Sequence, residues 1–401
     1  MISAQEPFEK PRWIAAINPA TVILVCALSL SVLGFIVLFS ASVSLKSDPY
    51  FFLSKQLVWF VLAGVACFVV SRVDLVHARR HVWVFAAVCL VGLLLVLIPG
   101  IGIAVKGSRR WLGFGPVRMQ ISEFAKLAMI FGLAHYLALN QTRIHELVRG
   151  FLAPLAWISV FSGLILLEPD FGTSALTFAI GVLLLFLAGG RLRYLISAFA
   201  GAACLLTVAV IHNPNRLARF LAFLDVEGNR SAGTYQLWQA ILAFAAGGMD
   251  GVGLGQGRQQ NSFLPEVHTD FILAVIAEEL GLAATIGVLL LFAILFTAGL
   301  FHLRKAPNLF QFLLVAGCLL LISLQALINL GVVTGCLPTK GMSLPFISAG
   351  GSNLLLMGIL VGVFLNTQRA WASPALMHRE RTLKEVGGER PAPGARQEGL
   401  D

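Results

Sequence analysis

Long apolar runs constrain the fold of this sequence more than any other feature. A helix needs about 20 apolar residues to cross the hydrocarbon of a bilayer, and such windows recur ten times: 18–41, 53–71, 82–102, 120–139, 152–168, 172–189, 194–211, 269–300, 310–332 and 350–367. Lipid leaves backbone polar groups no outside partner, and these runs are too long and evenly apolar for barrel strands. The sequence therefore predicts an all-α polytopic membrane protein of about ten transmembrane helices.

Composition agrees with a chain that has lipid as much of its solvent. Hydrophobic residues make up 58% of the 401 residues and charged residues 12%, whereas soluble domains carry about 25% charged residues. The run after Lys10 and Arg12 is too long for a cleaved signal and is expected to remain as the first span. The six cysteines show no CxxC or Cys/His spacing, so we predict neither a disulfide framework nor a zinc site.

Basic residues predict the orientation, since cytoplasmic loops are enriched in Lys and Arg. They follow the even-numbered spans, at Arg72, Arg79, Arg80, Arg143, Arg149, Arg191, Arg193, Arg304 and Lys305. Both termini are therefore expected in the cytoplasm. Residues 1–17 would form a cytoplasmic N-terminus and residues 18–369 the membrane domain. Residues 370–401, rich in Gly, Pro, Arg and Glu, would form a disordered tail.

The longest break between spans covers residues 212–268 and predicts a large extracytoplasmic loop between spans seven and eight. Its apolar stretch 237–244 suggests a re-entrant or interfacial helix. Glycines stand at positions 251, 253, 255 and 257. Without a preceding strand or a following Lys-Ser/Thr, they favour tight turns and close backbone approach over a phosphate loop.

The predicted outer side also carries positive charge, against the usual bias. The residues are Lys106, Arg109, Arg110, Arg118, Arg216, Arg219, Arg230, Arg258 and Lys340. Any one of them can be solvated loop charge, but the set favours an anionic ligand at the outer face. Nucleic acid is implausible on that side of the membrane.

Acidic residues near or inside the spans are candidate functional groups, because intramembrane acids are costly and usually paired or functional. Asp270 begins span eight, where it is either a helix N-cap or a functional carboxylate. Glu278 and Glu279 lie deeper in that span, about 100° apart, so at least one should face protein. Glu123 and Lys126, at i and i+3, form either a local ion pair or a site in which the lysine holds an anion.

Other motifs border the predicted outer face. Arg109, Arg110 and Trp111 form a constellation suited to a sugar ring and a phosphate, although Trp111 can equally be an interfacial anchor. Lys340 lies in a Pro/Gly-broken segment, 335–352, of the kind tolerated at membrane depth only where it lines protein or a cavity. Glu266 and His268 lack a third metal ligand at a recognised spacing.

Several strings together resemble the SEDS family, which serves shape, elongation, division and sporulation. They are KGSRRWLGFG with QISEFAKLA, LEPDFGTS, TYQLWQAILAFAAGGMDGVGLGQG, FLPEVHTDFILAVIAEELG and NLGVVTGCLPTKGMSLPFISAGGS. The last is more similar to the division branch (FtsW) than to the elongation branch (RodA). The sequence departs from the family at Ile121, Ala349 and Asn353, where Pro, an aromatic residue and Ser are usual.

The resemblance implies a peptidoglycan glycosyltransferase that polymerises lipid II, by inverting displacement of undecaprenyl pyrophosphate, in septal wall synthesis. Asp270 would be the catalytic carboxylate, and Glu123, Lys126, Glu278 and Glu279 its supporting charges. The candidates for binding pyrophosphate or sugar are Arg109, Arg110, Trp111, Lys340, Arg216 and Ser352. A divalent cation, Mg²⁺ or Mn²⁺, would be compatible with this chemistry, although no metal ligands are identified.

The implied setting is the bacterial cytoplasmic membrane, with the active site on its outer face. The implied partners are lipid II, a class B penicillin-binding protein and other divisome proteins. Two alternatives stay open: a lipid II flippase, which would need polar groups along a route to both faces, and a non-catalytic divisome scaffold, which would not need the buried charges.

Overall fold

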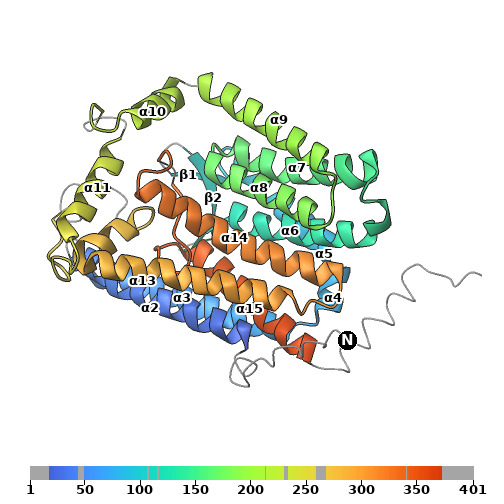
Figure 1. Ribbon diagram of the computed structural model, residues 1–401, viewed down its shortest axis with the longest axis horizontal. Helices are drawn as coiled ribbons and strands as arrows, with labels where there is room; N and C mark the ends of the chain where they lie inside the picture. The colour runs from blue at the N-terminus through green and yellow to red at the C-terminus, as the bar shows by residue number, and fades with distance from the viewer. Residues whose placement is uncertain are drawn as a thin grey trace, which may run out of the picture.

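The computed structural model describes residues 18–43, 49–105, 108–114, 117–212, 214–229, 234–258, 268–339 and 341–372. These segments are mainly helical (Figure 1). The helices are α2 (Pro19–Val43), α3 (Pro49–Arg72), α4 (Leu75–Arg80), α5 (Val82–Leu97), α6 (Ile121–Leu139), α7 (Ala153–Leu167), α8 (Phe171–Leu187), α9 (Leu192–Ile211), α10 (Pro214–Leu224), α11 (Tyr235–Gly247), α13 (Ile272–Leu303), α14 (Leu309–Val333) and α15 (Gly351–Ala372). A single π-helical turn, Val148–Leu152, leads into α7.

The helices coincide with the predicted spans and confirm a polytopic membrane fold. Eight described helical segments are long and apolar enough to cross a bilayer. The other two predicted spans correspond to α5 and α8, shorter apolar helices of 16 and 17 residues. Helix α5 ends at Leu97, five residues before the predicted limit, because Pro99 and Gly100 follow and Gly100 has a φ of 95°. Helix α11 covers the predicted apolar stretch 237–244.

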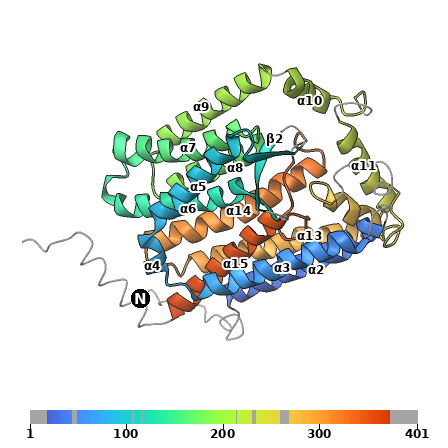
Figure 2. The ribbon, with the colours of Figure 1, turned by 180° about the vertical axis from the view of Figure 1, so that it is seen from behind.

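A small β-sheet between α5 and α6 was not predicted, so the all-α prediction was wrong at this place. Strands β1 (Gly102–Val105), β2 (Ser108–Phe114) and β3 (Val117–Gln120) form an antiparallel sheet in that order. The sheet lies toward the end of the bundle opposite α4 (Figures 1 and 2). A sheet with open edges cannot lie in hydrocarbon, so its place at one end of the bundle fits the bilayer.

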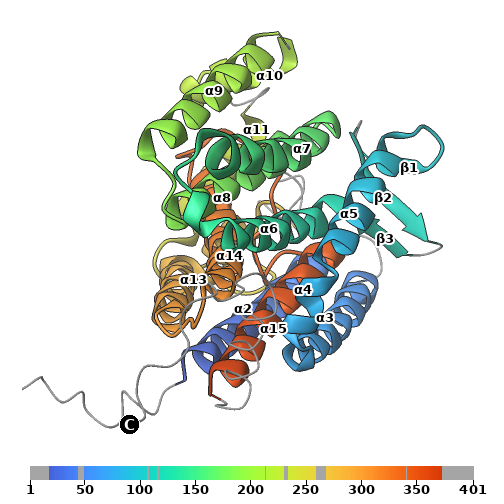
Figure 3. The same ribbon diagram turned by 90° about the vertical axis from the view of Figure 1, so that its right-hand side faces the viewer.

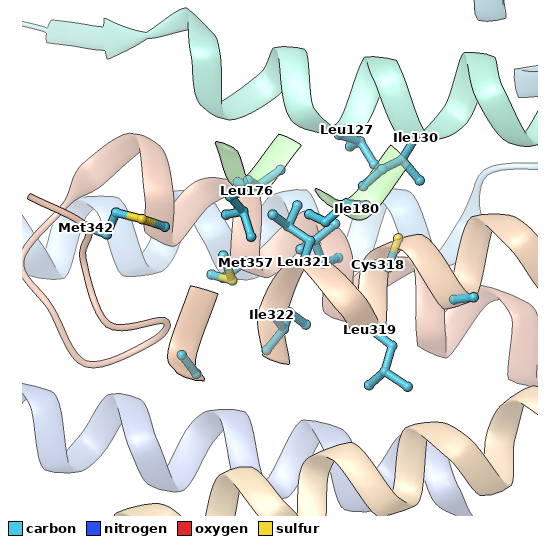
Figure 4. Close-up of a cluster of buried hydrophobic side chains, with 14 of the residues drawn as sticks. Leu127, Ile130, Leu176, Ile180, Cys318, Leu319, Leu321, Ile322, Met342 and Met357 are labelled. Atoms are coloured by element: carbon cyan, nitrogen blue, oxygen red, sulfur yellow. The ribbon is translucent and has the colours of Figure 1, made fainter. Parts of the chain in front are cut away.

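Helix α14 lies at the centre of the bundle, in contact with α6, α8, α11, α13 and α15 (Figure 3). Its inward side packs apolar residues against α6 and α8; Figure 4 shows Leu127, Ile130, Leu176, Ile180, Cys318, Leu321 and Ile322 in this cluster. Because α14 is surrounded by protein over most of its length, polar groups on it can be held away from lipid.

Close backbone contact joins α15 to α3. A methyl group added at Gly358 would lie 2.5 Å from the Ala63 carbonyl oxygen, and one at Gly362 would lie 2.7 Å from that of Cys67. Small residues four apart allow this approach in membrane helices. At the other end of α15, Gln368 accepts a hydrogen bond from the Ala20 amide at 3.1 Å. The start of α2 and the end of α15 therefore lie together.

Candidate functional site

Asp270 lies in the turn that precedes α13, at the same end of the bundle as the sheet (Figure 1). The capping position of α13 is Phe271, one residue after Asp270. Its side chain is partly exposed and lies against a broken backbone segment: a methyl group added at Gly341 would lie 2.9 Å from Asp270 Oδ2. Asp270 is thus partly exposed as a residue, and its carboxyl lies close to the backbone at Gly341.

Hydrogen bonds from neighbouring elements fix the backbone around Asp270. Asn329 on α14 donates from Nδ2 to the carbonyls of Asp270 (2.9 Å) and Met342 (2.6 Å). Ser348 donates its hydroxyl to the Thr269 carbonyl at 2.6 Å. The amide of Ala349 donates to the His268 carbonyl at 2.8 Å. The segment 341–349 and α14 therefore hold the turn from two sides.

Glu123 and Lys126 form the predicted ion pair in the first two turns of α6. The Lys126 Nζ lies 3.0 Å from each carboxyl oxygen of Glu123, and it also donates to Gln325 Oε1 at 3.2 Å. Lys126 is 1% exposed. A charge this deeply buried is tolerable only when it is paired and hydrogen-bonded, and both conditions are met.

Two amides on α14 connect this ion pair to the Asp270 turn. Gln325 accepts from Lys126, and Asn329, one turn later on the same face, donates to the Asp270 carbonyl. Gln325 also donates to the Ser343 carbonyl (3.0 Å) and to Asn353 Oδ1 (3.2 Å). A continuous polar strip thus runs from α6 across α14 to the start of α13.

Gln325 and Asn329 were not predicted as site residues from the sequence. The signal was present, because two amides four residues apart interrupt an apolar span and must find partners. Asn353, noted only as a departure from the family, completes the strip by donating to the Ser343 hydroxyl at 2.6 Å.

The two arginines on β2, Arg109 and Arg110, have different surroundings. Arg110 forms an ion pair with Asp170 at 3.2 Å and donates to the Pro169 carbonyl at 2.8 Å, so it joins the sheet to the turn between α7 and α8. Arg109 is exposed and Trp111 is partly buried. Among these three candidates, Arg109 is the most open to an external ligand.

Ser352 joins α15 to the sheet, since its hydroxyl accepts a hydrogen bond from the Gln120 amide at 2.9 Å. It is buried. Lys340 and Lys106 lie outside the described residues. Arg216 lies on α10, but its side chain is outside the described part of the structure.

Glu168 is a buried acid in the turn between α7 and α8. Neither of its carboxyl oxygens has a hydrogen-bond partner among the described residues. Burial, and then the neighbouring Asp170 carboxylate, raise the pKa of Glu168 to about 8, although Arg110 acts in the opposite direction. This carboxyl therefore holds a proton near neutral pH.

Glu278 and Glu279 are both buried, which confirms that acids at this depth face protein. Their described contacts are with the glycine-rich segment and α2, and not with Lys126. Glu279 Oε1 accepts from the Ser40 hydroxyl (2.7 Å) and from the Gly255 amide (2.8 Å), and Glu278 Oε1 accepts from the Arg258 amide (2.7 Å). The described residues contain no cluster of three His, Cys, Asp or Glu side chains placed to hold a metal ion.

Comparison with known proteins places these features in a family. The sequence model of the FtsW/RodA/SpoVE family, described as "Cell cycle protein", matches residues 20–372. The chain is 38% identical over 356 residues to a probable peptidoglycan glycosyltransferase FtsW of Legionella pneumophila, covering 86% of this chain and 90% of that protein. It is 36% identical over 363 residues to Stage V sporulation protein E of Bacillus subtilis, covering 88% and 97%.

Solved structures share the fold. A chain of a peptidoglycan synthase complex, studied for its coordination of polymerization and crosslinking, aligns with a TM-score of 0.73 and 25% identity, over 88% of this chain and 98% of that chain. The crystal structure of the rod shape determining protein RodA of Thermus thermophilus aligns with a TM-score of 0.66 and 24% identity, over 90% and 100%. The match over nearly all of the membrane portion shows that this chain belongs to the FtsW/RodA/SpoVE family.

Proposed function

We propose that this protein is a peptidoglycan glycosyltransferase that polymerises lipid II into glycan strands during septal wall synthesis. The names of its relatives support this activity, and the FtsW naming among them supports the septal role. The observation that carries the proposal is the place of Asp270, a partly exposed acid at one end of the bundle. Its backbone is held by α14, and its carboxyl lies against the segment 341–349.

The proposed reaction is a single displacement with inversion. Asp270 accepts the proton of the acceptor sugar hydroxyl as that oxygen forms a bond to the anomeric carbon of the donor. The bond from that carbon to the pyrophosphate oxygen breaks, and undecaprenyl pyrophosphate leaves with the electron pair. An α-linked donor thereby gives a β-linked product. A carboxylate base positioned at the acceptor contributes typically 100- to 10,000-fold to such a step.

Positive groups would stabilise the leaving pyrophosphate. Lys126 supplies a fixed charge linked through Gln325 and Asn329 to the Asp270 turn, and Arg109 supplies an exposed one on the sheet. Arg110 and Ser352 are proposed to act indirectly, because their described contacts hold the sheet in place. Trp111, Arg216 and Lys340 remain candidate contacts for the sugar or the pyrophosphate.

A divalent cation is compatible with the residues at this end of the bundle. Mg²⁺ is commonly held by one or two carboxylates together with substrate phosphates, and Asp270 offers one such carboxylate. A bound Mg²⁺ or Mn²⁺ would neutralise charge on the pyrophosphate.

The proposed setting is the bacterial cytoplasmic membrane, with both termini in the cytoplasm and the site on the outer face. The hydrogen bond from the Ala20 amide to Gln368 supports the start of α2 and the end of α15 lying on the same side of the membrane. A class B penicillin-binding protein and other divisome proteins are the proposed partners, by analogy with the synthase complex whose chain aligns with this one.

The test is a gel assay for glycan strands. Purified protein with a class B partner is incubated with labelled lipid II, and wild type is compared with Asp270→Ala. Strands from wild type and none from the variant are expected. If neither protein makes strands and wild type moves lipid II across proteoliposomes, the protein is a flippase; if it does neither, the scaffold alternative replaces the proposal.

A further inference from the structure

Helix α13 is broken at Gly281, two residues after the second of its paired acids. Gly281 has a φ of 76° and a ψ of −173°, which divides the helix into an outer half, 272–280, and a long inner half. A helix break normally leaves carbonyls and amides without partners. Here the break lies within a bundle, so those backbone groups need partners from another segment.

The glycine-rich segment 248–258 supplies these partners. The amides of Val252 and Gly253 donate to the carbonyls of Glu278 and Glu279, at 2.9 and 3.0 Å. In return, the amide of Leu282 donates to the Gly248 carbonyl at 3.0 Å. The segment therefore takes the place of the missing helical turn and is joined by backbone to both halves of α13.

Glycine is required for this approach. A methyl group added at Gly247 would lie 1.8 Å from the Ala277 carbonyl oxygen, and one added at Gly251 would lie 2.2 Å from that of Glu279. The two backbones are therefore in direct contact. This explains Gly247 and Gly251 in physical terms without a phosphate ligand.

The two acid side chains extend the same junction. Glu279 Oε1 accepts hydrogen bonds from the Gly255 amide and from the Ser40 hydroxyl of α2. Glu278 Oε1 accepts one from the Arg258 amide. Both side chains are 1% exposed. These side-chain hydrogen bonds add to the backbone hydrogen bonds that join the segment to α13.

We propose that Glu278 and Glu279 are positioning residues that anchor the glycine-rich segment in the break of α13 and thereby fix the outer helix half that begins two residues after Asp270. The inference rests on the proposed glycosyltransferase activity. The outer half of α13, the glycine-rich segment and α11 form one unit. Ser40 on α2 is connected to this unit by its hydrogen bond to Glu279. Displacement of this unit would strain the Asn329 hydrogen bond to the Asp270 carbonyl and move the carboxylate relative to Lys126, which is held by contacts with α6 and α14.

The experiment compares Glu279→Ala, Glu279→Gln and Ser40→Ala in the full-length protein with its class B partner. The control is Thr297→Val, in the inner half, whose hydroxyl bonds only within its own helix among the described residues. Glu279→Ala is expected to lower kcat by roughly 10- to 100-fold, the effect of displacing a catalytic group by about 1 Å, with an unchanged KM for lipid II. Glu279→Gln retains an acceptor oxygen and should recover most of kcat, whereas Ser40→Ala should give a smaller loss.

Hydrogen exchange of residues 248–258 provides the second readout. Exchange should be faster in Glu279→Ala, near wild type in Glu279→Gln and unchanged in Thr297→Val. A normal kcat in Glu279→Ala despite faster exchange would overturn the positioning role, and unchanged exchange would overturn the anchor itself. If wild type makes no strands, the proposed function fails, while the exchange comparison still decides whether the anchor exists.

Discussion

Replacement of Lys126 by methionine tests the buried ion pair most sharply. Methionine keeps most of the side-chain length and removes the ammonium that contacts both oxygens of Glu123 and Gln325 Oε1. Glu123 is 6% exposed, so its carboxylate would stay buried without its cation. Removing one partner of a buried pair typically costs about 3–5 kcal/mol.

The second variant in this series, Lys126→Met with Glu123→Gln, removes both charges. The double variant has no lone buried carboxylate. We therefore expect its loss of stability to be about 2–3 kcal/mol smaller than the sum of the losses in the two single variants. The free energy of unfolding is measured by titration with denaturing detergent. Both variants should fail to make glycan strands, since neither retains the cation, and this separates the loss of activity from the loss of stability.

Two outcomes would refute this reasoning. A cost below about 1 kcal/mol for Lys126→Met would mean that the pair behaves like an exposed surface pair. Glycan strands at the wild-type rate from the double variant would mean that Lys126 has no part in catalysis.

Three further predictions concern neighbouring features. Asn329→Leu leaves the part-buried carbonyl of Asp270 and the buried carbonyl of Met342 without this donor. A cost of about 1–3 kcal/mol is expected for the buried Met342 carbonyl, and a polymerisation rate equal to wild type would contradict the role of the strip. Gly281→Ala should destabilise, because φ is 76° and the new methyl would lie 2.4 Å from the Gly251 amide nitrogen, whereas Gly287→Ala, with open space at its Cβ, is the neutral control in the same unfolding titration. The pKa of Glu168 is raised from 4.5 to about 8. Between these pH values the folded state binds a proton on Glu168 that the unfolded state has released. The contribution of this residue to the free energy of unfolding therefore falls as pH rises, by up to about 1.4 kcal/mol per pH unit. Glu168→Gln should remove that fall, and an identical pH dependence in both proteins would contradict it.

Much of the fold was predictable because apolar length is a strong physical signal. Ten apolar runs marked the described long helices, and the i, i+3 spacing of Glu123 and Lys126 marked a real ion pair. The sheet was not predictable in this way, since strands of four to seven residues between two apolar helices leave no periodic pattern of sufficient length.

The candidate site was only partly predictable, because sequence indicates which residues need partners but not which partners they find. Asp270, Glu123 and Lys126 were candidates because of their positions in the spans, and their roles came from the resemblance. The amides Gln325 and Asn329 that connect them were not predicted. Arg110 was predicted to bind a ligand, whereas in the structure it forms an ion pair with Asp170. Glu278 and Glu279 were assigned to the charges around Asp270, whereas their described contacts are with the glycine-rich segment. Such pairings depend on tertiary neighbours far apart in the chain.

The most direct test of the account is the initial rate of glycan polymerisation by Asp270→Asn, relative to wild type. The variant is isosteric with wild type, and the unfolding titration checks that the two proteins have the same free energy of unfolding. Asparagine cannot accept the proton of the acceptor hydroxyl, so the account predicts a rate at least about 100-fold lower than wild type. A rate within tenfold of wild type would show that another group removes the proton, and would contradict the assignment of Asp270 as the base.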